Sequence, residues 1–162
     1  MTLNPSITAN NDEAVLLACF NGELPLSEMG SHFIDRVAKL LEEHCELVEC
    51  PVEHSFVPGH YCRQITMPKG AIVVSKKHKT WHPYTVTKGR VSVILETSTG
   101  LRLQNINVPE GAHFTAITAP GTRRLILCRE ETTWTTFHPT ELTDLEEIEK
   151  LLIESPVKIL EA

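Results

Sequence analysis

The hydrophobic positions change their spacing twice along the chain. Residues 13–45 have a helical pattern, and from Ser27 onward the apolar residues recur at intervals of three or four, the spacing of an amphipathic helix. Ser27 follows closely on Pro25 and is a suitable N-cap. The apolar stripe consists of Met29, Phe33, Val37, Leu40 and Leu41. The sequence therefore predicts helices ahead of the first strand.

From about residue 46 the pattern changes to short apolar runs separated by turns rich in glycine and proline, of which Lys88-Gly89 is one. Short strands at intervals of about 8–12 residues with such turns are typical of a β-sandwich or a small barrel. The predicted strands are residues 61–67, 71–75, 84–87, 91–96, 101–108, 113–118, 123–129 and 133–138. We therefore expect a mainly β domain.

After His138 the pattern returns to that of a helix. Thr143 and Glu146 have the spacing of a capping box. An apolar stripe follows at Leu142, Leu145, Ile148, Leu151 and Leu152. We expect three segments, which are an N-terminal arm with helices that pack on the barrel (1–45), a β-barrel (46–140), and a C-terminal helix with a surface tail (141–162).

The composition fits one acidic globular domain. The chain has 162 residues, of which 41% are hydrophobic, and a formal net charge of -6. An acidic chain does not favour general nucleic-acid binding, because neutralising phosphates requires a basic surface. No apolar run is long enough to span a membrane, and the polar start lacks the features of a signal peptide. Five cysteines without a CxxC pair indicate reduced thiols, so we expect a cytoplasmic protein.

The segment between Gly70 and Gly89 contains two histidines, His78 and His82. It resembles the first motif of the cupin superfamily, in which two glycines enclose two histidines and a glutamate. In that alignment His78 takes the second histidine position, and His82 lies on or next to the glutamate position. Lys76 stands where the first histidine is expected.

The second cupin motif is a proline-rich turn followed by a histidine. Pro120-Gly121 resembles the turn, and Arg123 or Arg124 stands in place of the histidine. An alternative placement ends on His113, one position early. The resemblance covers about residues 60–138. It implies a single cupin-like double-stranded β-helix (jelly-roll) barrel, flanked by N- and C-terminal α-helices.

A narrower resemblance, over about residues 46–152, is to small cupin-like proteins encoded by tailed phages and prophages. It is carried by Glu49-Cys50-Pro51-Val52, Pro58-Gly59, His78-Lys79-Thr80, Pro120-Gly121-Thr122-Arg123-Arg124 and His138-Pro139-Thr140. This group implies a fold and a genomic setting without a defined reaction. It places the protein in the cytoplasm of a bacterial host.

Histidines that face a barrel lumen are candidate metal ligands. Imidazole and carboxylate ligands suit Fe, Mn, Ni, Cu or Zn. Residues i and i+4 of a straight strand are about 13 Å apart, whereas metal–nitrogen distances are about 2.0–2.1 Å. His78 and His82 can therefore share a divalent transition metal only if the chain bends between them. His138 is the favoured third ligand, with His113 and His60 as alternatives.

Cations stand where the cupin motifs have metal ligands, and arginine offers paired donors to phosphate or carboxylate. Trp81 and Tyr84 would add flat faces for a base or a sugar. These residues predict a pocket for a small anionic ligand. The candidate ligand-binding set is Arg63, Lys76, His78, His82, Tyr84, Arg123 and Arg124.

Three functions are open at this point. The first is a phage-type cupin-like protein that binds a small anionic molecule, bearing phosphate or carboxylate and resembling a nucleotide, without strong catalysis. The second is a metal-dependent cupin enzyme of the isomerase, epimerase, lyase or dioxygenase type. The third is a structural or assembly protein with a filled barrel. The sequence assigns no catalytic residue, and pairing of helices or sheets favours a homodimer.

Overall fold

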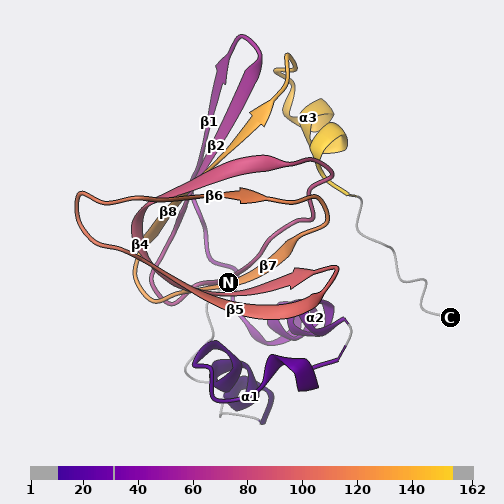
Figure 1. Cartoon of the computed structure of the whole chain (residues 1–162), viewed down its shortest axis with the longest axis vertical. Coiled ribbons are helices and arrows are strands. Elements are labelled where there is room, and N and C mark those ends of the chain that lie inside the picture. Colours follow the sequence, from indigo (N-terminus) through magenta and orange to yellow (C-terminus); the bar gives the residue numbers. More distant parts are fainter. Residues whose placement is uncertain (1–10, 31, 155–162) are drawn as a thin grey trace, which may run out of the picture.

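The structure is a computed structural model that describes residues 11–30 and 32–154. Within these residues, eight strands form one curled antiparallel sheet that helices flank (Figure 1). The elements are α1 (Asn11–Phe20), the 3-10 helix η1 (Leu26–Glu28), α2 (Phe33–His44), β1 (Val52–Val57), β2 (His60–Met67), β3 (Ile72–Val74), β4 (His82–Thr97), β5 (Gly100–Val108), β6 (Phe114–Thr118), β7 (Arg123–Cys128), β8 (Thr132–Pro139) and α3 (Leu145–Leu152). The predicted mainly β fold with flanking helices is confirmed.

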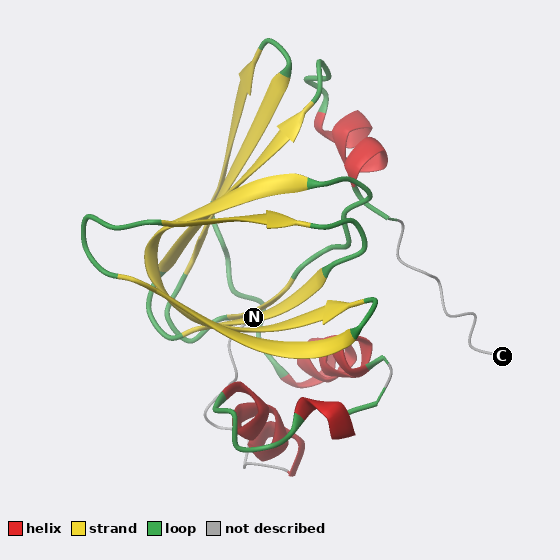
Figure 2. Ribbon diagram, in the orientation of Figure 1, coloured by secondary structure: helices red, strands yellow, loops and turns green. Residues whose placement is uncertain are grey.

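Strand β4 joins the two halves of the curled sheet. The strand order is β1-β2-β8-β4-β7-β3, and β5 and β6 also pair with β4. The first part of β4 pairs with β6 and β8. The part from Gly89 onward pairs with β5, and the following residues pair with β7. Because one long strand belongs to both halves, the sheet folds over on itself (Figure 2). Side chains of its inner face line a cavity, the lumen of the barrel.

The turn expected at Lys88-Gly89 is a bulge inside β4. The register with β8 shifts between Val86 and Lys88, and Gly89 has a φ of 111°. A Cβ at this position would lie 2.3 Å from Thr132 Oγ1, so the close approach requires glycine. The prediction of two separate strands here is wrong, because the glycine bends one strand and does not reverse the chain.

Helix α2 begins at Phe33 and not at Ser27 as predicted. Ser27 lies in η1, and the chain then turns through Gly30 and His32, whose φ angles are 71° and 61°. Positive φ angles do not fit a right-handed helix. The helix therefore starts only after His32.

Two hydrophobic clusters lie on opposite faces of the sheet. Val93 and Ile126 belong to the cluster inside the barrel, whereas their neighbours Ile94 and Leu125 belong to a cluster shared with α1 and α2. Both faces of this part of the sheet are buried, which explains its nearly continuous apolar sequence. The two helices thus cover the outer face beside β7, and the inner face lines the lumen (Figure 1).

Strand β1 is absent from the predicted strands. Five of its six residues are exposed, so it lacks the alternation that reveals a half-buried strand. The five cysteines are free thiols, as expected. Among the described helices, none has the length and hydrophobicity that crossing a membrane requires. Most of the expected N-terminal arm (residues 1–10) and the expected tail (155–162) lie outside the described residues.

Candidate functional site

Strand alternation arranges the lumen in layers. The lumen-facing residues of β2 are Tyr61, Arg63, Ile65 and Met67, and the first three pair with His138, Thr136 and Trp134 of β8. Successive residues of one face are about 6.6 Å apart along a strand. The lumen therefore has a layer of imidazoles near α3, a layer with arginine beneath it, and an apolar floor below that.

Three histidine rings meet in the first layer. The ring centroids of His78 and His82 are 4.3 Å apart, those of His82 and His138 4.7 Å, and those of His78 and His138 5.3 Å. One ligand atom from each ring can be chosen so that all three lie within 4.8 Å of one another. His60 and His113, the other two candidates for a third ligand, are exposed and do not line the cavity.

A bend brings His78 and His82 together. His82 is the first residue of β4, whereas His78 lies before that strand in an isolated bridge to Ile153. The residues after His78 bend instead of continuing a strand. The expected condition for a shared site, a break between the two histidines, is therefore met.

The three imidazoles are held in their neutral form. Burial, together with the neighbouring His82 and His138, lowers the pKa of His78 to about 3. Burial likewise lowers the pKa of His138 to about 4. The pKa of His82 is also lowered, mainly by burial. Neutral imidazole is the form that binds metals, so at neutral pH no proton competes for these nitrogens.

The hydrogen bonds of the triad fit a metal centre. His138 is 1% exposed, its Nε2 lies 3.0 Å from Thr136 Oγ1, and its Nδ1 is buried without a partner. His82 Nδ1 lies 3.3 Å from the carbonyl oxygen of Thr80. Metal-bound histidines usually engage the second ring nitrogen in this way, which orients the ring. An unpartnered buried nitrogen is costly unless something binds it, so the donor set fits a metal ion.

Arg124 places a buried cation next to the triad. The residue is 7% exposed, and no ion pair to it is recorded within residues 11–30 and 32–154. Its Nη2 donates to Thr118 Oγ1 at 2.9 Å, and its Nε is buried without a partner. The guanidinium stacks 4.8 Å from the Tyr84 ring centroid and 5.7 Å from that of Trp134. A buried charge without a counter-charge is rare, so this cation is prepared for an anion.

The other predicted cations differ in their surroundings. Arg63 lines the cavity from β2 and is partly buried. Lys76 is exposed at the rim and forms an ion pair with Glu149 of α3. Glu149 is the only acidic residue among those that line the cavity. The positive charges of Arg63 and Arg124 are therefore not balanced within the lumen.

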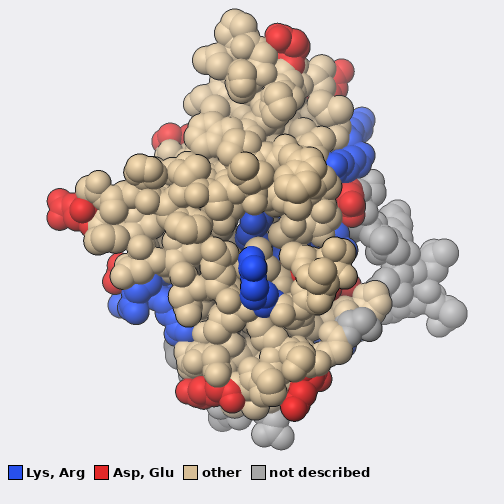
Figure 3. Space-filling view, in the orientation of Figure 1, with Lys and Arg blue, Asp and Glu red and all other residues tan. Residues whose placement is uncertain are grey.

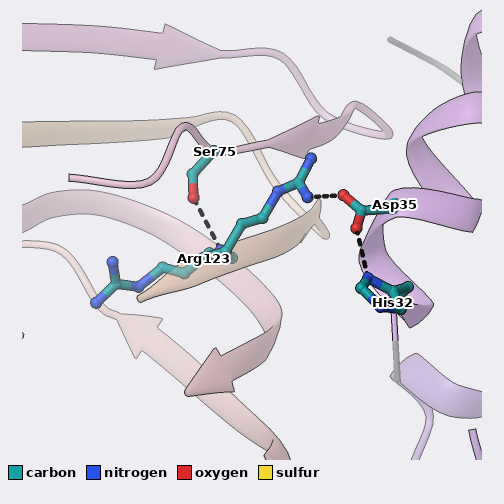
Figure 4. Close-up of polar contacts among 5 residues, drawn as sticks. His32, Asp35, Ser75 and Arg123 are labelled. Atoms are coloured by element: carbon teal, nitrogen blue, oxygen red, sulfur yellow. Dashed lines mark hydrogen bonds and ion pairs between the residues drawn. The ribbon is translucent and has the colours of Figure 1, made fainter. Parts of the chain in front are cut away.

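Arg123 does not reach the cavity, contrary to the expectation for it. Arg123 and Arg124 are neighbours on β7, so their side chains point to opposite faces of the sheet. The guanidinium of Arg123 extends to Asp35 on α2 and forms an ion pair with it (Figure 4). Its contribution is to attach the helix to the sheet.

The two aromatic residues predicted to stack on a ligand have other surroundings. Tyr84 is 2% exposed and stacks on Trp134 at 4.5 Å, so it supports Arg124 from below and does not line the cavity. Trp81 is 66% exposed and lies outside the cavity. Because Trp81 directly precedes the inward-facing His82, its side chain points to the other face of the strand.

Helix α3 closes the site on the side of the histidines. Ile148 and Leu152 pack on Tyr61, and both line the cavity. The helix is capped by Asp144, whose side chain accepts from the backbone N–H of Glu147 at 3.0 Å. The predicted capping box at Thr143 is therefore one position early.

Tyr61 is a site residue that sequence analysis did not select. Its hydroxyl lies 2.7 Å from His54 Nδ1, and its ring stacks on His138 with 5.9 Å between centroids. Burial raises the pKa of its phenol. The available signal was alternation, because Tyr61 is two residues before Arg63 and shares its face.

The cavity has a volume of about 340 Å³. In the space-filling view, basic side chains are visible where this face of the molecule is hollowed, in the region between β6 and β5 (Figure 3). The cavity thus combines imidazoles, unbalanced positive charge and an apolar floor in a space suited to a small molecule.

No protein-family model matches the chain, and no curated protein sequence matches it. Several solved structures resemble its fold. A cupin domain from Bordetella pertussis Tohama I has a TM-score of 0.43 and 11% identity, covering 59% of this chain and 97% of that one. An RmlC-like cupin family protein with a double-stranded β-helix fold from Methanocaldococcus jannaschii has a TM-score of 0.44 and 14% identity, covering 59% and 84%.

A third similar structure is the formate complex of oxalate decarboxylase from Lactobacillus farciminis, with a TM-score of 0.49 and 11% identity, covering 68% of this chain and 35% of that one. At such low identity and TM-score, function is inferred from the residues of the site alone. Solved structures similar to this chain thus include cupin-domain proteins.

Proposed function

We propose that this protein binds a divalent transition metal through His78, His82 and His138 and holds a small anionic molecule beside it. Arg124 binds the anion from within the lumen, and Arg63 adds positive charge. The proposal combines two of the interpretations that the sequence leaves open, a metal site and an anion site. It makes them parts of one cavity.

The observation that carries the proposal is the meeting of three neutral imidazoles beside a buried cation without a counter-charge. The three rings supply ligand atoms within 4.8 Å of one another. Two of the buried polar atoms without a partner, His138 Nδ1 and Arg124 Nε, belong to this site. Both atoms are costly to bury unless they bind something. A metal and an anion supply the two missing partners.

The chemistry of the ligand atoms narrows the choice of metal. Imidazole suits Zn, Cu, Fe and Ni, whereas Mn prefers oxygen ligands. Of the predicted metals Fe, Mn, Ni and Zn, the triad therefore favours Fe, Ni and Zn. Three protein ligands leave a coordination position open, as in catalytic zinc sites. A metal held in this way would act as a Lewis acid on an oxygen of the bound anion.

The residues of this chain define the rest of the site. Arg124 binds and orients the anion, and its own position is fixed by Thr118 and by the Tyr84 ring. Helix α3 covers one side of the cavity with Ile148 and Leu152. Tyr61 contributes a hydroxyl that His54 holds by a hydrogen bond.

Metal analysis of the purified protein tests the first half of the proposal. After chelation and reloading with Zn²⁺, Ni²⁺ or Fe²⁺ without oxygen, we expect about one ion per chain by elemental analysis. The His78→Ala/His138→Ala variant is expected to lose it. The matched control is His60→Ala/His113→Ala, which removes two exposed histidines and leaves the content unchanged. Equal metal content in both double variants would contradict the assignment.

Two neighbouring arginines provide a matched test of the second half. Arg124→Gln removes the cavity cation, and Arg123→Gln removes a cation one residue away that lies outside the cavity. In thermal shift assays against phosphate- and carboxylate-bearing metabolites, we expect stabilisation of the wild type and of Arg123→Gln. Arg124→Gln should lose it. An anion that stabilises Arg124→Gln as well as the wild type does not bind here.

A purely structural role with a filled barrel is not favoured, because the lumen contains a cavity of about 340 Å³. The remaining sequence-based expectations stay predictions. They are the phage or prophage origin, the cytoplasm of a bacterial host as location, and the homodimer.

A further inference from the structure

We infer that the anion is a monocarboxylate with an apolar body, whose carboxylate is bound by Arg124 and whose body lies on the apolar floor. The inference rests on the proposed function and specifies its ligand class. It follows from the order of the layers in the lumen.

The floor of the cavity contains no charged side chain. The apolar residues that line it from the strands are Ile65, Met67, Val73, Ile126 and Trp134. Ile65 pairs with Trp134, and Val73 pairs with Ile126. All five lie one or more steps deeper than the arginine layer along their strands. A ligand that reaches the floor therefore meets only apolar groups there.

Of the two arginines that line the cavity, Arg124 is buried and Arg63 is partly buried, and the buried one offers few free donors. Arg124 presents Nε without a partner, while its Nη2 already donates to Thr118. The two sides of a guanidinium suit the paired oxygens of a carboxylate. A phosphate ester brings more oxygens and a second negative charge, and every buried oxygen without a donor is costly. A carboxylate therefore matches the free donors of Arg124 better than a phosphate does.

The body of the ligand must also be apolar. A sugar or a nucleoside would place hydroxyl groups against Ile126 and Val73, where no polar side chain of the floor could bind them. An apolar cavity of about 150 Å³ holds a benzene molecule. The cavity of about 340 Å³ therefore has room for a carboxylate and an aliphatic or aromatic body of similar size.

A chain-length series tests this inference. Acetate, propionate, butyrate, valerate and hexanoate would be titrated by protein-observed NMR into chelated and into Zn²⁺-loaded protein. Because burial of one methylene contributes about 0.8 kcal/mol, we expect affinity to rise about fourfold per added methylene until the floor is filled. Propyl phosphate should bind more weakly than butyrate.

Two variants separate the head of the ligand from its body. Val73→Thr is close in size and places a hydroxyl on the floor, so it should flatten the chain-length dependence. Arg124→Gln should weaken every acid by about tenfold or more. The series in the wild-type protein stands independently of both variants, should either fold poorly.

The possible results separate this inference from the proposed function. Affinity that is independent of chain length, or tighter binding of propyl phosphate than of butyrate, overturns the inference while the anion site stands. No binding of any acid or phosphate overturns the anion half of the proposed function as well. The metal half is decided separately by metal content. A rise with chain length that Val73→Thr flattens supports the apolar monocarboxylate.

Discussion

Acidification should destabilise the metal-free protein well above the pH at which its carboxylates titrate. The folded protein keeps His78 and His138 neutral down to a pKa of about 3 and about 4. In the unfolded chain their pKa returns to about 6.5. Above that pH neither state binds a proton at these rings, and their contribution to the free energy of unfolding is fully present. As the pH falls below 6.5, only the unfolded chain gains protons, so stability is lost.

The size of the loss follows from the difference between the pKa of each histidine in the folded protein and its pKa in the unfolded chain. Between pH 7.5 and pH 5, protonation of one histidine lowers the free energy of the unfolded chain by about 2 kcal/mol. In the folded protein the same histidine is still almost entirely neutral at pH 5. His78 and His138 together should therefore remove on the order of 4 kcal/mol. The lowered pKa of His82 acts in the same direction. The total free energy of unfolding of a small domain is about 5–15 kcal/mol, so the loss should be a large fraction of it.

Urea unfolding of chelated protein at pH 7.5 and pH 5.0 measures this loss as a change in midpoint at constant m-value. The control variant is His78→Gln/His138→Gln, which removes both titrating rings and keeps polar side chains. It should lose about 4 kcal/mol less between the two pH values. Asp35 and Glu149, whose pKa values are lowered by Arg123 and Lys76, act only below about pH 4.5. Equal losses in the wild type and the variant would refute the reasoning.

Four further substitutions test the fold and the surroundings of the site. Gly89→Ala would place a Cβ 2.3 Å from Thr132 Oγ1 and should lower the unfolding free energy by about 3 kcal/mol or more. Gly100→Ala, at a φ of 117° with no neighbouring atom within 4 Å, should cost less in the same urea assay. Tyr61→Phe removes the hydroxyl bound to His54 and should leave metal content unchanged, measured by elemental analysis. Arg123→Gln removes a partly exposed ion pair and should change stability by about 1 kcal/mol or less.

The sequence predicted the parts of the site that depend on local pattern. His78 and His82 are identified by the resemblance of their segment to the first cupin motif, and the need for a bend between them follows from strand geometry alone. The sequence does not decide which of His138, His113 and His60 is the third ligand. This depends on which strand lies beside β4, and that register is set by contacts between distant segments. No local pattern reports such a pairing.

The two arginines of β7 show the same division. Alternation predicts that Arg123 and Arg124 face opposite sides, but it does not say which side is the lumen. That is decided by the covering of the outer face, where Asp35 of α2 pairs with Arg123. For Tyr84 the direction of the side chain could be predicted, but its surroundings could not. Its inward direction is predictable, yet it lies beneath Arg124 because Trp134 stacks against it from β8.

The site is the part of the lumen that works against the stability of the fold. An apolar residue at each of these positions would pack without a desolvation cost, whereas three imidazoles and an unpaired guanidinium lose hydration on burial. Below the arginine layer, the same strands carry Ile65, Ile126 and Trp134, so the barrel can fill this space with apolar groups. Proteins tend to break such local rules at functional sites. Because a metal or an anion that binds only the folded state stabilises it, each one should offset part of the cost that its binding residues impose.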